Sequence, residues 1–206
     1  MLVGCQGHES RGYLEELAGK ELSRVYPTKN IEDLFEQFPN GFTVSQMRVV
    51  DDTNVFVYLE AREKGKLLVG TIKQLNSKTK EEEKSIPFQY VDGQFVFENE
   101  EEAKKLWPQG KFVFQELQLN KDILAKAKLV NKNYTKKEES STGDNTFYLK
   151  YNIQLPVVSR ILGIDESQPV ELFIFGRDES DGFVYEIGTE QENQTTLWEM
   201  IREIRK

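Results

Sequence analysis

Two residue types that commonly carry nucleophilic or metal chemistry occur once each in this 206-residue sequence, as Cys5 and His8. One cysteine cannot form an internal disulfide or a multi-thiolate zinc site, and one histidine excludes paired imidazole ligands. A Ser-His-Asp triad would have to use His8, which sits in a polar N-terminal segment that nothing obvious in the sequence holds in place. Glycine-rich phosphate loops, Gly-x-Ser-x-Gly and His-Glu-x-x-His are absent. We therefore expect no enzyme activity, no catalytic residue, no metal ligand and no cofactor.

The position of the single cysteine, Cys5, is more informative than the fact that the sequence contains only one. The run from Leu2 to Cys5 is typical of a bacterial lipobox, in which small residues precede a cysteine that is lipidated and becomes the mature N-terminus. Gly4 leaves the backbone before the scissile bond unobstructed for a peptidase, and the Cys5 thiol is the nucleophile that takes the diacylglyceryl group. The sequence thus predicts lipid attachment at Cys5, followed by a short polar tether.

A secretory signal peptide needs a basic region and an apolar stretch of about 7–15 residues, whereas Cys5 is preceded only by residues 1–4. We therefore expect a start codon upstream of Met1, with a basic, apolar leader. The alternative is that the tetrapeptide matches by chance and the chain is an intracellular protein with an ordinary thiol.

Carboxylates offer weaker hypotheses. The segment from Arg177 to Gly182 is the densest acidic cluster in a turn and could offer oxygen ligands to calcium. It lacks the spacing of a calcium loop, however, and a solvated hairpin tip explains it better, as it does for Asp51 and Asp52. A hydrolase that uses two carboxylates would require a pocket in which two acids of raised pKa converge.

The composition narrows the classes of partner. The net charge is −8 and the pI is near 5.0, with 38% apolar and 30% charged residues. This acidic balance argues against nonspecific binding of nucleic acid, which depends on clustered positive charge. The 13 Phe, 8 Tyr and 2 Trp residues suffice for a core, and no stretch of about 18 apolar residues could span a bilayer.

The hydrophobic periodicity predicts helices and strands in mixed order. Helices are expected at residues 12–24, 31–38, 99–107, 156–162 and 195–205. Strands are expected at residues 42–50, 55–61, 67–75, 86–91, 94–97, 126–134, 146–155, 170–175 and 182–187. Residues 112–119 fit a strand by their aromatics, whereas the nearby Ile123 and Leu124 favour a helix. Thr28 or Asn30 can cap the second helix, and Asp92-Gly93 is a two-residue hairpin signal. The stretch from Asn99 to Trp107 resembles a capped acidic helix.

These elements predict one α+β domain: an antiparallel sheet of about eight strands with N- and C-terminal helices packed on one face. The C-terminal helix would bury Leu197, Trp198, Ile201 and Ile204. Residues 1–11 are interpreted as lipobox remnant and tether, and residues 12–206 as the domain. The other face of such a sheet can stay solvated and bind a partner. The side chains of Tyr90, Tyr148 and Tyr151 could line that surface, although packing in the core is the better explanation for these aromatic positions.

One stretch, Tyr26-Pro27-Thr28-Lys29-Asn30-Ile31-Glu32-Asp33-Leu34, resembles the staphylococcal tandem-type lipoproteins, paralogous surface proteins of firmicutes. Weaker similarities occur at residues 84–96 and 151–164. The resemblance implies a non-catalytic α+β domain, tethered to the membrane and facing outward, and it strengthens the lipobox interpretation of Cys5.

Related acidic surface lipoproteins act as immunity proteins, and the resemblance extends that expectation to this chain. The partner would be a basic secreted antibacterial toxin, which an acidic surface would attract. The alternative function for a protein at the same location is that of a surface antigen or adhesin that interacts with a host. Both hypotheses place the chain on the extracytoplasmic side of the cell membrane, bound through a lipid anchor and to no nucleic acid.

Overall fold

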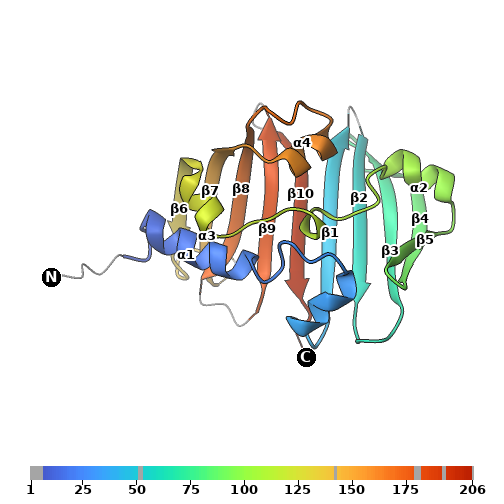
Figure 1. Cartoon of the computed structure of the whole chain (residues 1–206), viewed down its shortest axis with the longest axis horizontal. Coiled ribbons are helices and arrows are strands. Elements are labelled where there is room, and N and C mark those ends of the chain that lie inside the picture. Colours follow the sequence, from blue (N-terminus) through green and yellow to red (C-terminus); the bar gives the residue numbers. More distant parts are fainter. Residues whose placement is uncertain (1–6, 51–52, 142, 179–181, 192–193, 206) are drawn as a thin grey trace.

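The computed structural model describes residues 7–50, 53–141, 143–178, 182–191 and 194–205. Within these ranges ten strands form one open antiparallel sheet, and the helices are few and short (Figure 1). The strands are β1 (Phe42–Val50), β2 (Thr53–Ala61), β3 (Leu68–Asn76), β4 (Glu82–Val91), β5 (Gln94–Phe97), β6 (Lys128–Thr135), β7 (Asn145–Ile153), β8 (Val170–Asp178), β9 (Val184–Gln191) and β10 (Gln194–Glu203). The α-helices are α1 (Arg11–Leu22), α2 (Glu100–Leu106), α3 (Lys121–Lys126) and α4 (Pro156–Leu162), and the 3-10 helices are η1 (Ile31–Glu36) and η2 (Val113–Gln115). None of the helices in these ranges is both long enough and apolar enough to cross a membrane.

Two antiparallel meanders meet in the middle of the sheet. Strands β1 to β5 run outward to one edge and β6 to β10 run inward from the other, which gives the order β5-β4-β3-β2-β1-β10-β9-β8-β7-β6. At the seam between the halves, Val44 of β1 lies opposite Ile201 of β10, and Gln46 lies opposite Glu199. The predicted antiparallel meander is confirmed, but the predicted number of about eight strands is too low.

The predicted C-terminal helix is wrong, because residues 194–203 form β10 in the centre of the sheet. The spacing of Leu197 and Ile201 suits one face of a helix, but the two residues also share one face of a strand. Glu199 lies between them on that face and is 0% exposed. A carboxylate at a core position concealed the apolar period of two, and Trp198 on the opposite face added an apolar residue out of phase.

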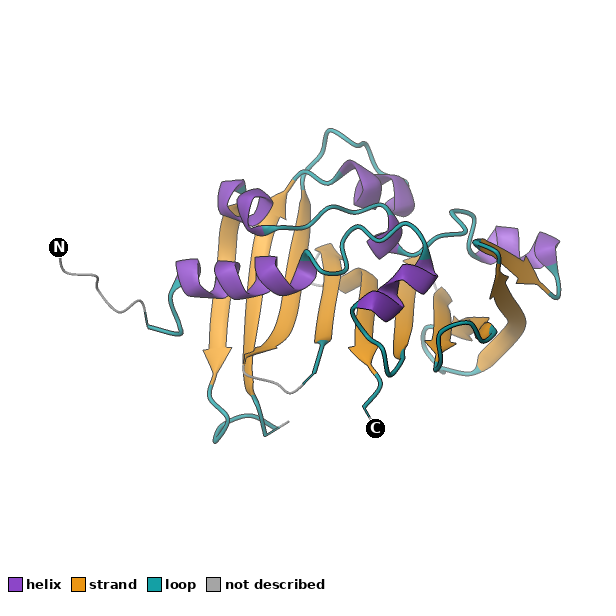
Figure 2. Ribbon diagram, turned by 60° about the horizontal axis from the view of Figure 1, so that its bottom comes forward, coloured by secondary structure: helices purple, strands orange, loops and turns teal. Residues whose placement is uncertain are grey.

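All the described helices lie on one side of the sheet, called here the covered face, and the opposite side is called the open face (Figures 1 and 2). Helices α1 and α3 pack on each other over the half that contains β6 to β9. The irregular chain with η1 and η2 lies over the central strands, and α2 lies at the end formed by β3 to β5. The predicted placement of the N-terminal helix on one face is confirmed.

Local capping explains where the first helices begin. Ser10 caps α1 through a 3.2 Å hydrogen bond that its side chain accepts from the Tyr13 amide, so the helix begins one residue earlier than expected. Asn30 caps the next helix as predicted, but residues 31–36 form a 3-10 helix. Leu34 is nevertheless buried. A segment this short, enclosed by Pro27 and Pro39, leaves little room for regular α-helical bonds.

Two other local patterns are confirmed. Asp92 and Gly93 form the predicted hairpin with φ values of 50° and 78°, both in the left-handed region that a type I′ turn requires. Asn99 caps the acidic helix α2 through a 3.1 Å bond from the Glu102 amide.

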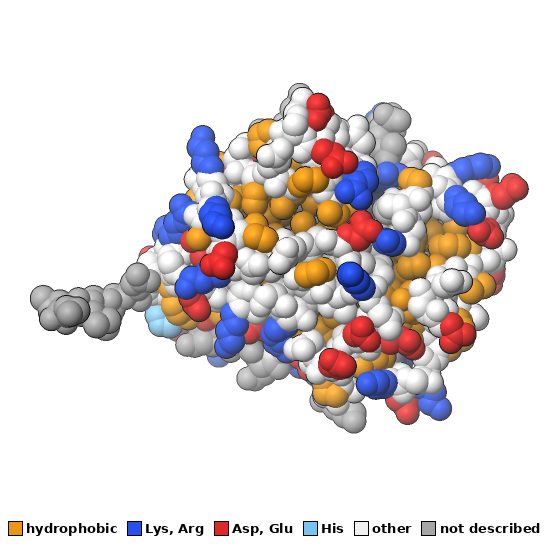
Figure 3. Space-filling model, in the orientation of Figure 1, with side chains coloured by type: hydrophobic (Ala, Val, Ile, Leu, Met, Phe, Trp, Pro, Cys, Tyr) orange, Lys and Arg blue, Asp and Glu red, His pale blue; other side chains and the backbone are white. Residues whose placement is uncertain are grey.

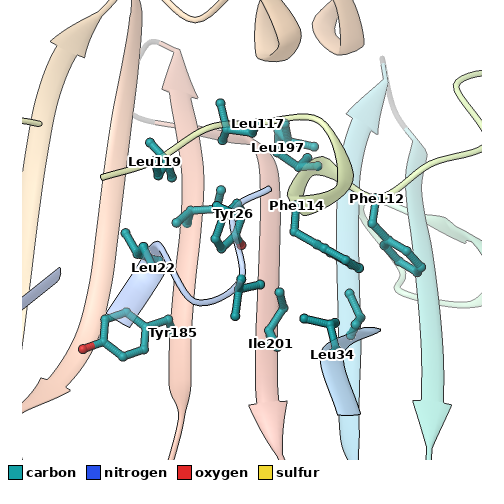
Figure 4. Packing of buried hydrophobic residues seen from close by; sticks show 14 of the residues in the cluster. Leu22, Tyr26, Leu34, Phe112, Phe114, Leu117, Leu119, Tyr185, Leu197 and Ile201 are labelled. Atoms are coloured by element: carbon teal, nitrogen blue, oxygen red, sulfur yellow. The ribbon is translucent and has the colours of Figure 1, made fainter. Parts of the chain in front are cut away.

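The segment 107–120, which the sequence left ambiguous, is neither a strand nor a long helix. It crosses the covered face as irregular chain around η2 and inserts several large side chains into the core (Figure 4). The four labelled side chains from this segment are Phe112, Phe114, Leu117 and Leu119, none more than 2% exposed. They meet Leu22, Tyr26 and Leu34 from the N-terminal part and Tyr185, Leu197 and Ile201 from the sheet. Phe112 directly precedes η2 and Phe114 lies within it, so the aromatic spacing that suggested a strand belongs to a 3-10 turn packed on the sheet.

Candidate binding surfaces and buried polar groups

The predicted lipid-attachment residue, Cys5, lies outside the described residues. The described chain begins with a turn in which the Ser10 amide donates to the Gly7 carbonyl at 2.8 Å. Lys132 of β6 donates to the carbonyl of Glu9 at 2.5 Å. The chain therefore enters the domain beside β6, at one edge of the sheet (Figure 1).

A buried carboxylate holds His8, a contact that nothing in the sequence indicated. Asp178, at the end of β8 and 3% exposed, accepts hydrogen bonds of 3.0 Å from the hydroxyls of Tyr13 and Tyr134. His8 Nδ1 lies 3.3 Å from Asp178 Oδ2, and the His8 ring packs against Tyr13 with centroids 4.6 Å apart. The Tyr13 hydroxyl donates to one oxygen of Asp178 and the Tyr134 hydroxyl to the other, so both carboxylate oxygens are engaged. The cluster joins the N-terminal segment to β6 and β8.

The second buried carboxylate, Glu199, lies at the centre of the covered face. It accepts hydrogen bonds from the Tyr26 hydroxyl at 3.0 Å and from the amides of Val113 and Phe114 at 2.6 and 3.0 Å. Burial raises the pKa of Glu199 to about 8, although these three donors oppose the shift. Burial and the adjacent carboxylate together raise the pKa of Tyr26 well above its ordinary value. No second acid is among the described partners of Glu199, so the paired acids that a hydrolase would need do not meet here.

The acidic turn considered for calcium is described only in part, since residues 179–181, like Asp51 and Asp52, lie outside the described ranges. Arg177 donates to Asp144 at 2.7 Å, and Asp178 is engaged by the tyrosines. In the part of the chain that the structure describes, no three His, Cys, Asp or Glu side chains come together as metal ligands would.

The open face carries two rows of side chains. Each row crosses seven adjacent strands, in the order β3, β2, β1, β10, β9, β8 and β7. One row consists of Lys73, Phe56, Met47, Trp198, Gly188, Phe173 and Lys150. The other consists of Thr71, Tyr58, Ser45, Met200, Glu186, Phe175 and Tyr148. With about 4.8 Å between strands, each row spans roughly 29 Å.

Close packing orders the aromatic side chains of these rows. The Phe173 ring lies directly over Gly188, where an added Cβ would come within 2.4 Å of Cζ. Tyr148 stacks on Phe173 with centroids 6.1 Å apart. Trp198 Nε1 donates to Glu186 at 3.0 Å. The face is therefore solvated but its aromatic groups are largely fixed by one another.

The three tyrosines named from the sequence separate in the structure. Tyr90 and Tyr151 are 4% and 0% exposed and belong to the core on the covered face, which agrees with the packing interpretation. Tyr148 lies on the open face in the second row. Only one of the three therefore belongs to a candidate binding surface.

At the β5 end, the open face is hollowed into what we call the distal groove, about 310 Å³ in volume. Its lining residues are Val69, Gly70, Pro87, Phe88, Gln89, Val96, Phe97 and Glu98. Among the described residues, five large aliphatic side chains are exposed, and four of them belong to this corner: Leu67, Val69, Val91 and Val96, between 39% and 55% exposed. Exposed apolar side chains gathered around a concave surface are typical of a binding site.

The two ends of the sheet differ in charge. The segment from Glu82 to Leu106, which builds the end with the distal groove, has seven carboxylates against three lysines. The segment from Lys121 to Thr135, which forms α3 and the opposite edge strand β6, has four lysines against one carboxylate. Lys and Arg side chains are accordingly prominent at the α3 and β6 end in Figure 3.

The distal groove was not identified from the sequence. Its one signal there was the pair of valines at 69 and 96, which fall on the outward-facing positions of their strands. An alternating pattern shows which residues share a face, but the helices that leave that face bare come from distant parts of the chain.

No protein-family profile matches this sequence, and no curated protein matches it.

Proposed function

We propose that the chain is a lipid-anchored extracytoplasmic protein that binds a protein partner without catalysis, and that the partner is a basic, secreted antibacterial toxin. The observation that carries this proposal is the distal groove, an exposed aliphatic surface in an acidic part of the sheet. The anchor is Cys5, as the lipobox spacing and the resemblance to tandem-type lipoproteins suggest. The protein would then act as an immunity protein.

The chemistry of the groove fits such a partner. Val69 and Val96 are 48% and 55% exposed, so a bound apolar side chain would remove both from water. Glu98 lines the groove, and Glu60 lies directly opposite Val69 on the neighbouring strand. A partner segment with apolar and basic side chains would match both features, and long-range attraction by the acidic end would speed encounter.

The anchor is tested by replacing Cys5 with Ala in the gene together with its natural upstream region. The wild-type protein should fractionate with membranes on the outer side of the cell, and the variant should appear in the medium. Retention of both forms in the cytoplasm would contradict the proposed extracytoplasmic location.

The binding role is tested by survival. Cells that lack the gene are exposed to secreted proteins from a strain that carries it, and the gene is then restored in three forms: wild type, Val69→Lys/Val96→Lys, and Gln118→Lys/Gln168→Lys. The last form is a matched control because it adds the same two charges at exposed positions outside the distal groove. Wild type and control should protect the cells, and the groove variant should not.

Two results would overturn the proposal. Cells without the gene would survive as well as the wild type, or the groove variant would protect fully. If the groove variant instead lost adhesion to host cells while protection was unaffected, the surface-adhesin alternative would replace the immunity role.

A further inference from the structure

The N-terminal segment is fixed to one edge of the sheet. Glu9 is held by Lys132 of β6, and His8 lies against Asp178, which also binds Tyr134 of β6. In the sequence only one residue separates Cys5 from Gly7, the first residue that the structure describes, and fully extended chain covers at most about 3.6 Å per residue. Acyl chains on Cys5 would therefore hold the β6 edge next to the bilayer, a step that depends on the anchor in the proposed function.

The charge of this edge is opposite to that of the whole chain. Lys126 and Lys128 are exposed, and neither forms an ion pair with any residue in the described ranges. Lys136 and Lys137 follow at the end of β6 and are also exposed. In a protein of net charge −8, residues 126–137 contain five lysines and no carboxylate, and Glu138 and Glu139 follow them.

The strand presents these groups in a geometry that suits a flat surface. Lys128 lies opposite Asn152, on the open face, whereas Lys132 lies opposite Leu149, on the covered face. Lysines therefore project on both sides of the edge. Between them a bulge separates Leu129 from Asn131, and the intervening Val130 is 49% exposed.

Protection against edge-to-edge association does not account for the sign of the charge. Charged side chains on edge strands prevent pairing with other sheets whether they are acidic or basic. The other edge of this sheet is flanked by Glu82, Glu83 and the glutamates that begin α2, so it uses mainly negative charge. The choice of lysine at β6 requires another reason.

We propose that the β6 edge, made of Lys126, Lys128, Val130, Lys132, Lys136 and Lys137, rests on anionic lipid headgroups of the membrane to which the chain is tethered. Lysines close to an anionic bilayer are attracted to it. The tether supplies a high local concentration, so this contact needs only modest affinity. The contact would set the orientation of the domain and turn the distal groove, at the opposite end of the sheet, away from the membrane.

The test uses the full 206-residue chain made without lipidation and with Cys5→Ser, so it does not depend on the anchor. Sedimentation with phosphatidylcholine vesicles is compared with sedimentation with vesicles that also contain phosphatidylglycerol. Binding should be at least about tenfold stronger to the anionic vesicles and should weaken as salt is added. Equal binding to both vesicles would overturn the proposal.

A charge-matched pair of variants separates the edge from net charge. The edge variant replaces Lys126, Lys128, Lys136 and Lys137 with Gln. Lys132 is kept unchanged because it donates to the carbonyl of Glu9. The control replaces Lys64, Lys66, Lys104 and Lys105 with Gln, all exposed and away from β6. Only the edge variant should lose binding to the anionic vesicles; an equal loss in both variants would show that general charge is responsible and would overturn the proposal.

The orientation of the domain on the membrane is measured with a fluorophore. Because Cys5→Ser leaves a chain free of thiols, the label attaches only at an introduced cysteine. An environment-sensitive label on Val130→Cys should shift to the blue on anionic vesicles, and the same label on Val96→Cys should not. A shift at position 96 alone would overturn the orientation. If these results hold but Cys5→Ala is not released from cells, the proposed anchor fails and the lipid-binding edge stands.

Discussion

Glu199 of β10 accepts a 3.0 Å hydrogen bond from the hydroxyl of Tyr26, a residue 173 positions earlier in the chain. The same carboxylate accepts the amides of Val113 and Phe114 at 2.6 and 3.0 Å. One buried side chain thus joins the central strand to both irregular segments that cover it. The arrangement replaces water around the carboxylate with three fixed donors but supplies no described cation, which is why burial still raises its pKa to about 8.

The free energy of unfolding should therefore decrease as the pH rises through the range in which Glu199 loses its proton. The pKa of about 8 in the folded protein exceeds the ordinary value of 4.5, so the folded state binds this proton more tightly than the unfolded chain does. The contribution is complete below about pH 4.5 and is lost as the pH rises toward about 8.

Glu199→Gln isolates this contribution, because glutamine does not titrate. Its amide group would face the Val113 amide, and we expect a cost of about 1–3 kcal/mol from the lost acceptor. The free energy of unfolding of the wild type minus that of the variant, measured with urea, should fall from about pH 5 to about pH 8. A difference that is constant or increases over that range would contradict the prediction.

The positions of single elements were largely predictable, but their assembly was not. Asp92-Gly93 and Asn99 determine a turn and a cap through contacts within a few residues, and both predictions are confirmed. Strand β10 could not be recognised because Glu199 occupies a core position, and its donors come from residues 26, 113 and 114. A sequence pattern cannot show that a distant segment will supply the hydrogen-bond donors for a buried carboxyl group.

The same reasoning applies to the candidate surfaces. The prediction of a solvated sheet face follows from alternation, but Tyr148, for which core packing was the preferred explanation, lies on that face. The distal groove depends on where β5 ends against β4, with the Glu98 amide donating to the Pro87 carbonyl at 3.1 Å. The role of His8 depends on Asp178, 170 residues away. Such contacts are defined by topology and not by local spacing.

Asp178 should be a stability determinant of the N-terminal attachment. Asp178→Ala removes the acceptor of the Tyr13 and Tyr134 hydroxyls and the partner of His8. We expect a loss of about 2–4 kcal/mol in the free energy of unfolding, since two bonds to a buried charged group disappear. Tryptic cleavage after Arg11 should accelerate, as followed by mass spectrometry. The exposed control Glu139→Ala should behave as the wild type, and an equal effect in both would refute the role of the cluster.

Gly188 should tolerate no side chain. An added Cβ would lie 2.4 Å from Phe173 Cζ and 2.6 Å from the Leu197 carbonyl oxygen. Gly188→Ala should therefore destabilise the protein by about 1–3 kcal/mol, the usual cost of overpacking. Adding Phe173→Leu should restore only part of that loss, since the carbonyl contact remains. Gly7→Ala, which has nothing within 4 Å of the added carbon, is the control. Thermal denaturation of the four forms provides the measurement, and an unchanged midpoint for Gly188→Ala would disprove the packing argument.

The two tryptophans should distinguish a ligand in the distal groove from a ligand on the two rows of the open face. Trp107 is 3% exposed and lies on the covered face, where it packs against the ring of Phe88, a residue that also lines the distal groove, with ring centroids 6.3 Å apart. Trp198 lies on the open face, in the row that also contains Phe173, opposite Met47 and Gly188. In Trp198→Phe, where only Trp107 remains, a ligand in the groove should change the emission.

In Trp107→Phe, where Trp198 remains, the same ligand should leave the emission and its quenching by acrylamide unchanged. A basic peptide with one leucine is a suitable first probe, because it matches the aliphatic lining and the acidic border of the groove. The opposite result, in which Trp198 responds and Trp107 does not, would move the binding surface from the groove to the aromatic rows. Val96→Lys in the Trp198→Phe background should abolish the Trp107 response, since it places a like charge in the path of the probe and removes apolar surface that is 55% exposed.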